Sequence, residues 1–115
     1  MSMRMEAILE DVQMQHAVSI RKMQNSCEEV SLILKALSHP QRLMVLGHLL
    51  QGSKTVGELV DLCDVSQSQM SQFLIRMKYE GLVSSEKNGK FQVYSLADKR
   101  LIHLMKTIQA EYCKT

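Results

Sequence analysis

A seven-residue repeat of mostly apolar positions runs through the N-terminal third of the chain. From about residue 4 to residue 37 there is no glycine or proline, and a stripe of residues steps alternately by four and three. The stripe consists of His16, Ile20, Met23, Cys27, Val30, Leu34 and Leu37. This spacing predicts one long helix, or two helices broken near Asn25-Ser26. A stripe of this length exceeds what a small core covers alone, so we expect a second chain to cover it.

The next helix is predicted over about residues 40–51. Pro40 ends the first helix, because the residue before a proline avoids the α region, and it suits the first turn of the helix that follows. Gly52 marks the end of this second helix. The side chains expected in the core are Leu43, Leu46, Leu49 and Leu50.

Two N-terminal capping patterns predict a pair of short helices joined by a tight turn. Thr55 and Glu58 form a T-x-x-E capping box that opens a helix to about Cys63. Ser66 and Gln69 form a second box, S-x-x-Q, that opens a helix over 66–80. The turn is Asp64-Val65, with Val65 and Met70 spaced as a hydrophobic staple, and Gly81 ends the second helix. Its expected buried face is Met70, Phe73, Leu74 and Met77.

A β-hairpin and a last helix complete the pattern. The strands are expected at about Val83–Glu86 and Lys90–Leu96, with the turn Lys87-Asn88-Gly89 between them. The Asn-Gly pair predicts a type I′ turn, which needs a positive φ at both central positions. Asp98 is predicted to cap the last helix. Its expected apolar side is Leu101, Leu104, Met105, Ile108 and Tyr112.

This order of elements predicts a mainly α fold with a small β-hairpin. It is typical of a winged helix-turn-helix with extra N- and C-terminal helices. We expect a helical extension over 1–25, followed by a DNA-binding and dimerisation domain over 26–115. A chain of 115 residues is long enough for one hydrophobic core.

Composition and charge agree with a DNA-binding protein of the cytoplasm. No apolar run approaches the ~20 residues of a membrane span, and the charged N-terminus does not resemble a secretory signal. The formal net charge is only +2, but it is unevenly distributed. Residues 1–30 carry a net charge of −2, whereas residues 66–90 carry +2. The positive charge therefore lies where the recognition elements are predicted.

The helix over 66–80 is the predicted DNA-reading element. Opposite its apolar face, the first two turns carry uncharged polar residues whose amides and hydroxyls hydrogen-bond to base edges. These are Gln67, Ser68, Ser71 and Gln72. Arg76, Lys87 and Lys90 are predicted to contact backbone phosphates of double-stranded DNA. The plainer alternative is a solvated helix face.

Several motifs together resemble the ArsR/SmtB family of repressors over about residues 30–113. They are Leu37-Ser38-His39-Pro40-Gln41-Arg42-Leu43, Val56-Gly57-Glu58-Leu59, the stretch 65–74, Glu80-Gly81-Leu82-Val83 and Val93-Tyr94-Ser95-Leu96-Ala97-Asp98. The resemblance implies a homodimer formed through the first and last helices. It also implies binding to a palindromic operator and release when an inducer binds, although the inducer is not indicated.

The metal sites of the family do not match this chain. At the Cys-x-Cys positions of one class stand Thr55 and Gly57. For the class with a site on the last helix, Asp98 remains, but the other ligand positions hold Arg100, Glu111 and Lys114. Cationic side chains at ligand positions repel a metal ion. We therefore expect no metal and no cofactor.

The three cysteines, Cys27, Cys63 and Cys113, form no disulfide framework. Among family members, the chain is most similar to the persulfide- or redox-sensing and the nodulation-type repressors. The C-terminal cysteine of the redox-sensing branch matches Cys113, whereas its second-helix cysteine falls on Gly47. One interpretation is a thiol-responsive repressor switched through Cys113 with Cys27, with Lys114 favouring the thiolate.

The plainer alternative for the cysteines is that Cys27 is a small core residue and Cys113 an incidental thiol. Cys63 is predicted to be a core residue. A rival function of another class is a winged-helix module that docks onto proteins. The sequence contains no nucleophile with an adjacent base, no glycine-rich phosphate loop and no paired catalytic carboxylates. It therefore does not suggest an enzyme.

Overall fold

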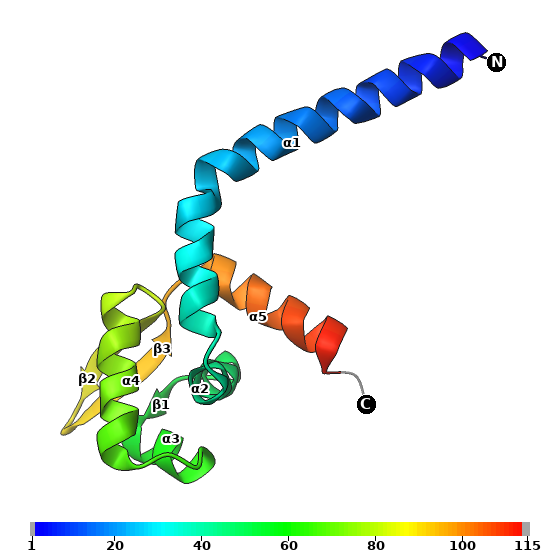
Figure 1. The fold of residues 1–115 in the computed structure, drawn as a ribbon. Coiled ribbons are helices and arrows are strands. Elements are labelled where there is room, and N and C mark those ends of the chain that lie inside the picture. Colours follow the sequence, from blue (N-terminus) through cyan, green and yellow to red (C-terminus); the bar gives the residue numbers. More distant parts are fainter. Residues whose placement is uncertain (1, 114–115) are drawn as a thin grey trace. The chain divides into compact units, whose positions relative to one another are not determined.

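The computed structural model describes the backbone of residues 2–113, and their side chains except those of residues 2, 3, 11, 12 and 14–18. The element order is α1 (Ser2–Leu37), α2 (Pro40–Leu50), β1 (Lys54–Thr55), α3 (Val56–Leu62), α4 (Gln67–Tyr79), β2 (Val83–Asn88), β3 (Phe91–Leu96) and α5 (Lys99–Tyr112) (Figure 1). The chain divides into two compact units, Met1–Lys35 and Ala36–Thr115. The predicted boundary at residues 25 and 26 remains a prediction.

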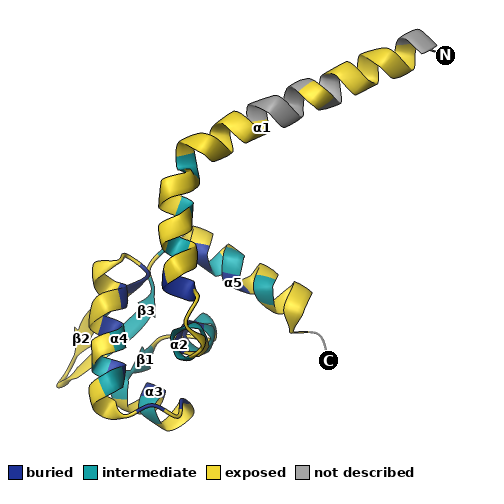
Figure 2. Cartoon of the chain, in the orientation of Figure 1, coloured by how far each residue is buried: buried dark blue, intermediate teal, exposed yellow. Residues whose placement is uncertain are grey.

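The first unit consists of most of helix α1. This helix continues through Asn25 and Ser26, so the alternative of two helices does not apply. Several large apolar side chains of the predicted stripe are exposed, including Ile20, Met23 and Leu34 (Figure 2). The side chain of His16, also placed on the stripe, lies outside the described residues. The stripe is therefore largely uncovered within the chain.

The second unit is a winged helix, with its helices packed on a small antiparallel sheet. The largest fully buried side chains come from three consecutive helices: Val45 and Leu46 of α2, Leu59 of α3, and Met70, Leu74 and Met77 of α4 (Figure 2). This confirms the predicted fold class. None of the helices in the described residues is both long and apolar enough to cross a membrane.

Helix α2 begins at Pro40, as predicted. His39 is its N-cap, and its Nδ1 accepts a 3.4 Å hydrogen bond from the backbone N–H of Arg42. The predicted buried face is partly wrong. Leu43 and Leu50 are only half-buried, whereas Val45 is fully buried. Val45 lies one turn before Leu49 on the same side of the helix. The prediction included only the leucines and therefore missed the burial of Val45.

The sheet has three strands in the order β1-β3-β2, one more than predicted. In β1, Lys54 pairs with Tyr94 and Thr55 with Val93, both in antiparallel register. A strand of two residues has no alternating pattern that could reveal it. Only the tertiary position of β3 beside this segment makes it a strand.

The hairpin turn differs from the predicted type I′ turn. Asn88 is the last residue of β2 and pairs with Phe91, so the two-residue loop is Gly89-Lys90. Gly89 has a φ of 63°, and no described residue other than glycine has a positive φ. A positive φ at the first central position alone is the pattern of a type II′ turn. The register moves the turn one residue along and makes Asn88 part of the strand.

Helix α4 ends, and helix α5 begins, as expected. After α4, Gly81 has a φ of 79°, its N–H donates to the Lys78 carbonyl at 3.1 Å, and the N–H of Leu82 donates to the Met77 carbonyl at 2.9 Å. This pair of bonds is a Schellman motif. Asp98 caps α5 by accepting a 2.8 Å hydrogen bond from the N–H of Arg100.

On α5, the predicted apolar side is buried only near its N-terminal end. Leu101 and Met105 are buried, Leu104 and Ile108 are half-buried, and Tyr112 is 85% exposed. The burial of Tyr112 was therefore predicted wrongly. The last turn of α5 extends past the other elements of its unit (Figure 2).

Candidate nucleic-acid interface

Helix α3 is held at its start by the predicted capping box. The Thr55 hydroxyl accepts from the N–H of Glu58 at 3.2 Å, and the Glu58 carboxylate accepts from the N–H of Thr55 at 3.0 Å. The hydrogen bond from the Thr55 backbone, and then that from its side chain, lower the pKa of Glu58 below its ordinary value. The reciprocal bonds confirm the prediction and define where the helix-turn-helix begins.

The cap of α4 is only half of the predicted box. The Ser66 hydroxyl accepts from the N–H of Gln69 at 3.1 Å. The side chain of Gln69, expected to return to the Ser66 backbone, instead donates to the amide oxygen of Gln41 at 3.4 Å. The second half of the predicted box is therefore replaced by a contact to α2. This contact ties the first turn of α4 to the start of α2.

The inner face of α4 fixes how the helix is rotated about its axis. Met70, Leu74 and Met77 are fully buried. Phe73 is half-buried, and its ring meets the His39 ring edge to face at 5.3 Å between centroids. With this side held against the core, the opposite side of α4 has a defined direction towards solvent.

Three of the predicted base-reading residues, Ser68, Ser71 and Gln72, lie on that opposite side, whereas Gln67 lies in the first turn, seven residues before the buried Leu74. Gln67, Ser68 and Gln72 are exposed, and Ser71 is half-buried. Ser68, Ser71 and Gln72 recur at helical spacing and form one strip, which we call the outer face of α4. Their amide and hydroxyl groups are not part of the buried face that packs α4 against the core.

Two further residues of the outer face were missed by the sequence reasoning. Ile75 is 66% exposed and Tyr79 is 91% exposed. Ile75 stands seven residues after Ser68 and four after Ser71, and Tyr79 follows Ile75 by four. This helical spacing was the signal in the sequence that could have identified both residues.

The basic residues predicted to contact phosphates are placed at the edge of the outer face and on the wing, the hairpin β2–β3. Arg76 is 75% exposed on its side chain, with its Nε 3.7 Å from the Glu80 carboxylate. Lys78, which was not predicted as a site residue, donates from Nζ to the Ser85 hydroxyl at 2.7 Å. Lys87 is two residues after Ser85, and therefore shares the face of β2 that meets α4.

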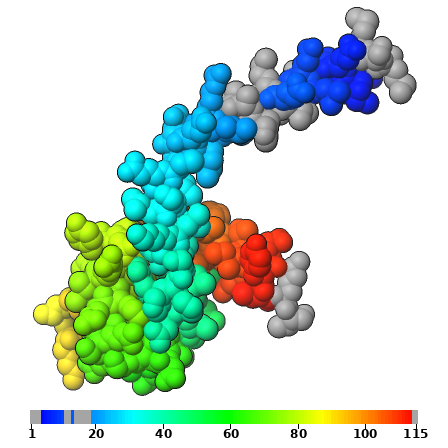
Figure 3. All heavy atoms as spheres, viewed as in Figure 1, coloured from blue at the N-terminus to red at the C-terminus, as the bar shows by residue number. Residues whose placement is uncertain are grey.

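The tip of the wing combines a cation with an aromatic ring. Lys90 Nζ lies 5.4 Å from the centroid of the Phe91 ring, within the range of a cation–π contact. Phe91 is 54% exposed. In the space-filling view the surfaces of α4 and the wing are continuous (Figure 3). We call the combined surface of the outer face of α4 and the wing the α4–wing face.

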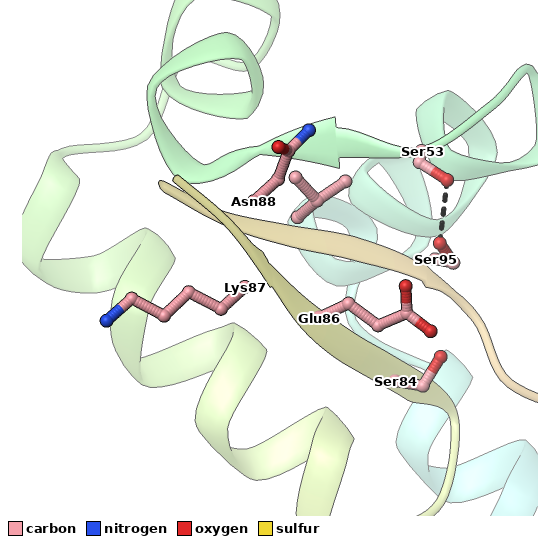
Figure 4. Close-up of a pocket in the computed structure, with 7 residues that line it drawn as sticks. Ser53, Ser84, Glu86, Lys87, Asn88 and Ser95 are labelled. Carbon is pink, nitrogen blue, oxygen red and sulfur yellow. Dashed lines mark hydrogen bonds between the residues drawn. The ribbon is translucent and has the colours of Figure 1, made fainter. Parts of the chain in front are cut away.

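A polar hollow lies on the other side of the wing. It has a volume of about 290 Å³ and is lined by Ser53, Ser84, Glu86, Lys87, Asn88, Val93 and Ser95. The Ser53 and Ser95 hydroxyls are hydrogen-bonded at 2.7 Å, and the Glu86 and Lys87 side chains point in opposite directions (Figure 4). The Glu86 carboxylate makes this hollow unfavourable for a phosphate, so the α4–wing face remains the better candidate.

The described acidic and histidine side chains were candidates for a metal site. Within the part of the chain that the structure describes, no three His, Cys, Asp or Glu residues are grouped as metal ligands would be. The Asp98 carboxylate is held by Arg100, with distances of 2.8 Å to Nη2 and 3.1 Å to Nε. The hydrogen bonds from Arg100 also lower the pKa of Asp98.

The cysteines occupy two kinds of environment. Cys63 is buried, as predicted, and burial raises the pKa of its thiol. Cys27 and Cys113 are exposed, so the alternative in which Cys27 is a core residue is wrong. Cys27 belongs to the first unit and Cys113 to the second. Lys114, expected to favour the Cys113 thiolate, lies outside the described residues.

Sequence comparison defines the family to which this fold and site belong. Residues 39–85 match the model of the bacterial regulatory proteins of the arsR family. The chain is 35% identical over 96 residues to the HTH-type transcriptional regulator YgaV of Escherichia coli, covering 82% of this chain and 96% of YgaV. It is 28% identical over 97 residues to the transcriptional activator HlyU of Vibrio cholerae, covering 84% and 90%.

Solved structures show the same architecture. The transcriptional repressor BigR from Xylella fastidiosa superimposes with a TM-score of 0.78 at 32% identity, covering 83% of this chain and 97% of BigR. A homodimeric winged helix-turn-helix DNA-binding domain, Mb0332 from Mycobacterium bovis, gives a TM-score of 0.67 at 26% identity, covering 76% and 82%. The fold and site thus define a winged-helix DNA-binding transcriptional regulator. The chain belongs to the arsR family of bacterial regulatory proteins.

Proposed function

We propose that this protein is a sequence-specific repressor whose helix α4 enters the major groove of DNA. The observation that carries this proposal is the contrast between the two faces of α4. On the inner face Met70, Leu74 and Met77 are fully buried, and on the outer face Ser68 and Gln72 are exposed and Ser71 is half-buried. Gln pairs with adenine through two hydrogen bonds, and Ser bonds to several bases. Gln67 contributes from the first turn of the helix.

The phosphate contacts proposed are those of Arg76, Lys87 and Lys90. Arg76 lies on α4 near its C-terminal end, and the two lysines lie on the wing. Contacts from two elements to the backbone fix the register of α4 in the groove without reading sequence. The +2 net charge of residues 66–90 supports this placement.

We further propose that the protein acts as a homodimer on a palindromic operator. Exposed apolar side chains along α1 need a partner, and the Mb0332 domain, which has this fold, is homodimeric. In a two-fold dimer the two copies of α4 read the same sequence on opposite strands, which produces a palindrome. Occupancy of a promoter would repress transcription in the cytoplasm, where bacterial DNA lies. The protein would act by binding alone, without catalysis, a metal or a cofactor.

The test is selection of duplexes from a random library, followed by affinity measurements on the selected duplex. The variant Ser68→Ala/Gln72→Ala is expected to bind it at least tenfold more weakly, because each good base contact contributes about 1–3 kcal/mol of discrimination. The matched control is Gln51→Ala/Ser84→Ala, which removes the same two side-chain types outside α4. Unchanged affinity in the α4 variant would contradict the proposed reading face.

The rival function, a protein-docking module, gives a different result in the same assay. A DNA-binding face with several Lys and Arg contacts loses affinity steeply as salt increases, because counterions are released on binding. A docking module binds no duplex even at low salt. A reporter fused to the selected operator then separates repression from activation, since HlyU shows that relatives include a named activator.

A second candidate, regulation through a thiol, is supported by one observation. Cys27 and Cys113 are exposed, whereas Cys63 is buried. An exposed thiol is accessible to oxidants and polysulfide. Duplex affinity is therefore to be measured with reductant and after mild oxidation. Loss on oxidation that is abolished by Cys113→Ser supports the switch, and unchanged affinity contradicts it.

A further inference from the structure

The outer face of α4 contains one large aliphatic side chain that the proposed hydrogen bonding leaves unexplained. Ile75 is 66% exposed, although the neighbouring apolar residues Leu74 and Met77 are fully buried. A single exposed apolar residue on a surface is ordinary. Its position is what distinguishes Ile75, because it lies between Gln72 and Tyr79 on the face proposed to enter the major groove.

We infer that Ile75 is a specificity-determining residue that packs against the C5-methyl group of a thymine. This inference rests on the proposed binding of DNA by α4. In the major groove, thymine is the base that presents a methyl group, and proteins read it by apolar contact. An aliphatic side chain has no hydrogen-bonding group, so a methyl group is the feature of the groove that it can distinguish.

The helical geometry locates this thymine relative to the bases that the polar residues read. Ile75 is three residues after Gln72 and four after Ser71, so the three side chains are neighbours on the helix surface. It is seven residues after Ser68, or about 10 Å along the helix axis at ~1.5 Å per residue. Base pairs are spaced by about 3.4 Å. The thymine is therefore expected about three base pairs from the base read by Ser68, and next to that read by Gln72.

Replacement of single thymines by deoxyuridine tests this contact, because it removes the methyl group and nothing else. The probe is the duplex selected from the random library by the wild-type protein. Each thymine is replaced in turn, and the affinity of the wild type and of Ile75→Ala is measured for every duplex. Combining the two changes gives a double-mutant cycle for the contact.

The expected result is a loss of about fourfold at one thymine position in each half-site, as follows from ~0.8 kcal/mol per buried methyl-sized group. For Ile75→Ala, removal of the methyl group at that position no longer changes the affinity. The control is Met44→Ala, which removes a 57% exposed apolar side chain from α2. Its affinity should change on each thymine replacement by the same factor as that of the wild type.

Three outcomes overturn the inference. In the first, replacement of thymine by deoxyuridine weakens binding at no position of the selected site. In the second, the replacement weakens binding by the same factor for the wild type and for Ile75→Ala. Both leave the proposed function intact if Ser68→Ala/Gln72→Ala still loses affinity. The third is absence of any duplex binding by the wild type, which overturns the proposed function as well. Thermal unfolding of Ile75→Ala confirms that the variant is folded before affinities are compared.

Discussion

Arg42 and Glu80 join the start of α2 to the end of α4 through one short ion pair. Arg42 Nη2 donates to Glu80 Oε1 at 2.6 Å, and the side chains are only 12% and 26% exposed. Arg42 Nε is buried and has no hydrogen-bond partner among the described residues. Glu80 is therefore the acceptor on which this largely buried guanidinium depends, and the pair holds the end of α4 against α2.

Loss of Glu80 should cost more stability than loss of Arg42. Glu80→Ala leaves a largely buried cation without its carboxylate, so we expect the free energy of unfolding to fall by about 2 kcal/mol. Arg42→Met removes the cation and its unpaired Nε together and should cost less. The double variant should be more stable than Glu80→Ala alone, as measured by urea unfolding.

Arg76→Ala serves as the control for the stability of this pair. It removes only the exposed 3.7 Å contact to Glu80, which contributes at most about 0.5 kcal/mol. An equal loss of stability in Arg76→Ala and Glu80→Ala would show that the Arg42 contact does not matter.

The same Arg76→Ala variant makes a prediction about DNA. If Arg76 contacts a phosphate, its removal should weaken binding by a similar factor for specific and unrelated duplexes. It should also reduce the slope of log affinity against log salt by about 1. Affinity is measured by fluorescence anisotropy at several salt concentrations. Lys106→Ala, an exposed cation on α5, is the matched control and should leave the slope unchanged.

The turn of the wing distinguishes Gly89 from its neighbour Asn88. Gly89→Ala places a side chain at a φ of 63°, so we expect a loss of about 1 kcal/mol in stability. Asn88→Ala should be nearly neutral, because Asn88 is a strand residue without a positive φ. Thermal unfolding of both variants tests this difference. A larger effect at Asn88 would favour the type I′ turn that the sequence suggested.

Stability should fall in acid partly through Glu58 and Asp98. The pKa values of both carboxyls are lowered in the folded chain, by hydrogen bonds from Thr55 and Arg100 respectively. The unfolded chain therefore binds protons at higher pH than the folded chain, and stability is lost as the pH falls below about 4. Glu58→Gln and Asp98→Asn should each flatten this dependence, as followed by urea unfolding at a series of pH values.

The three thiols should react at different rates with a maleimide. Cys63 should react most slowly, because it is buried and its pKa is raised, which reduces the thiolate that attacks. Mass spectrometry after short labelling of the native protein identifies the modified residues. Denatured protein, in which all three cysteines react, is the control. Rapid labelling of Cys63 would contradict its place in the core.

Local signals in the sequence determined most of the winged helix. The proline at position 40, the Thr55 capping box and the Gly81 terminator act over a few residues, so helix ends could be predicted without knowledge of the rest of the fold. Helical spacing likewise placed Met70 and Leu74 against the core, and thereby placed Ser68 and Gln72 on the opposite side.

The tertiary structure decided what depends on distant partners. Strand β1 exists because β3 lies beside it, Gln69 turns to Gln41 rather than to its own cap, and the register of the hairpin makes Asn88 a strand residue. The burial of Val45 and the partial exposure of Leu43 on α2 were also decided at this level. An aliphatic residue in an apolar helix is compatible with a core and a surface position, and the packing of neighbouring elements determines which side is covered.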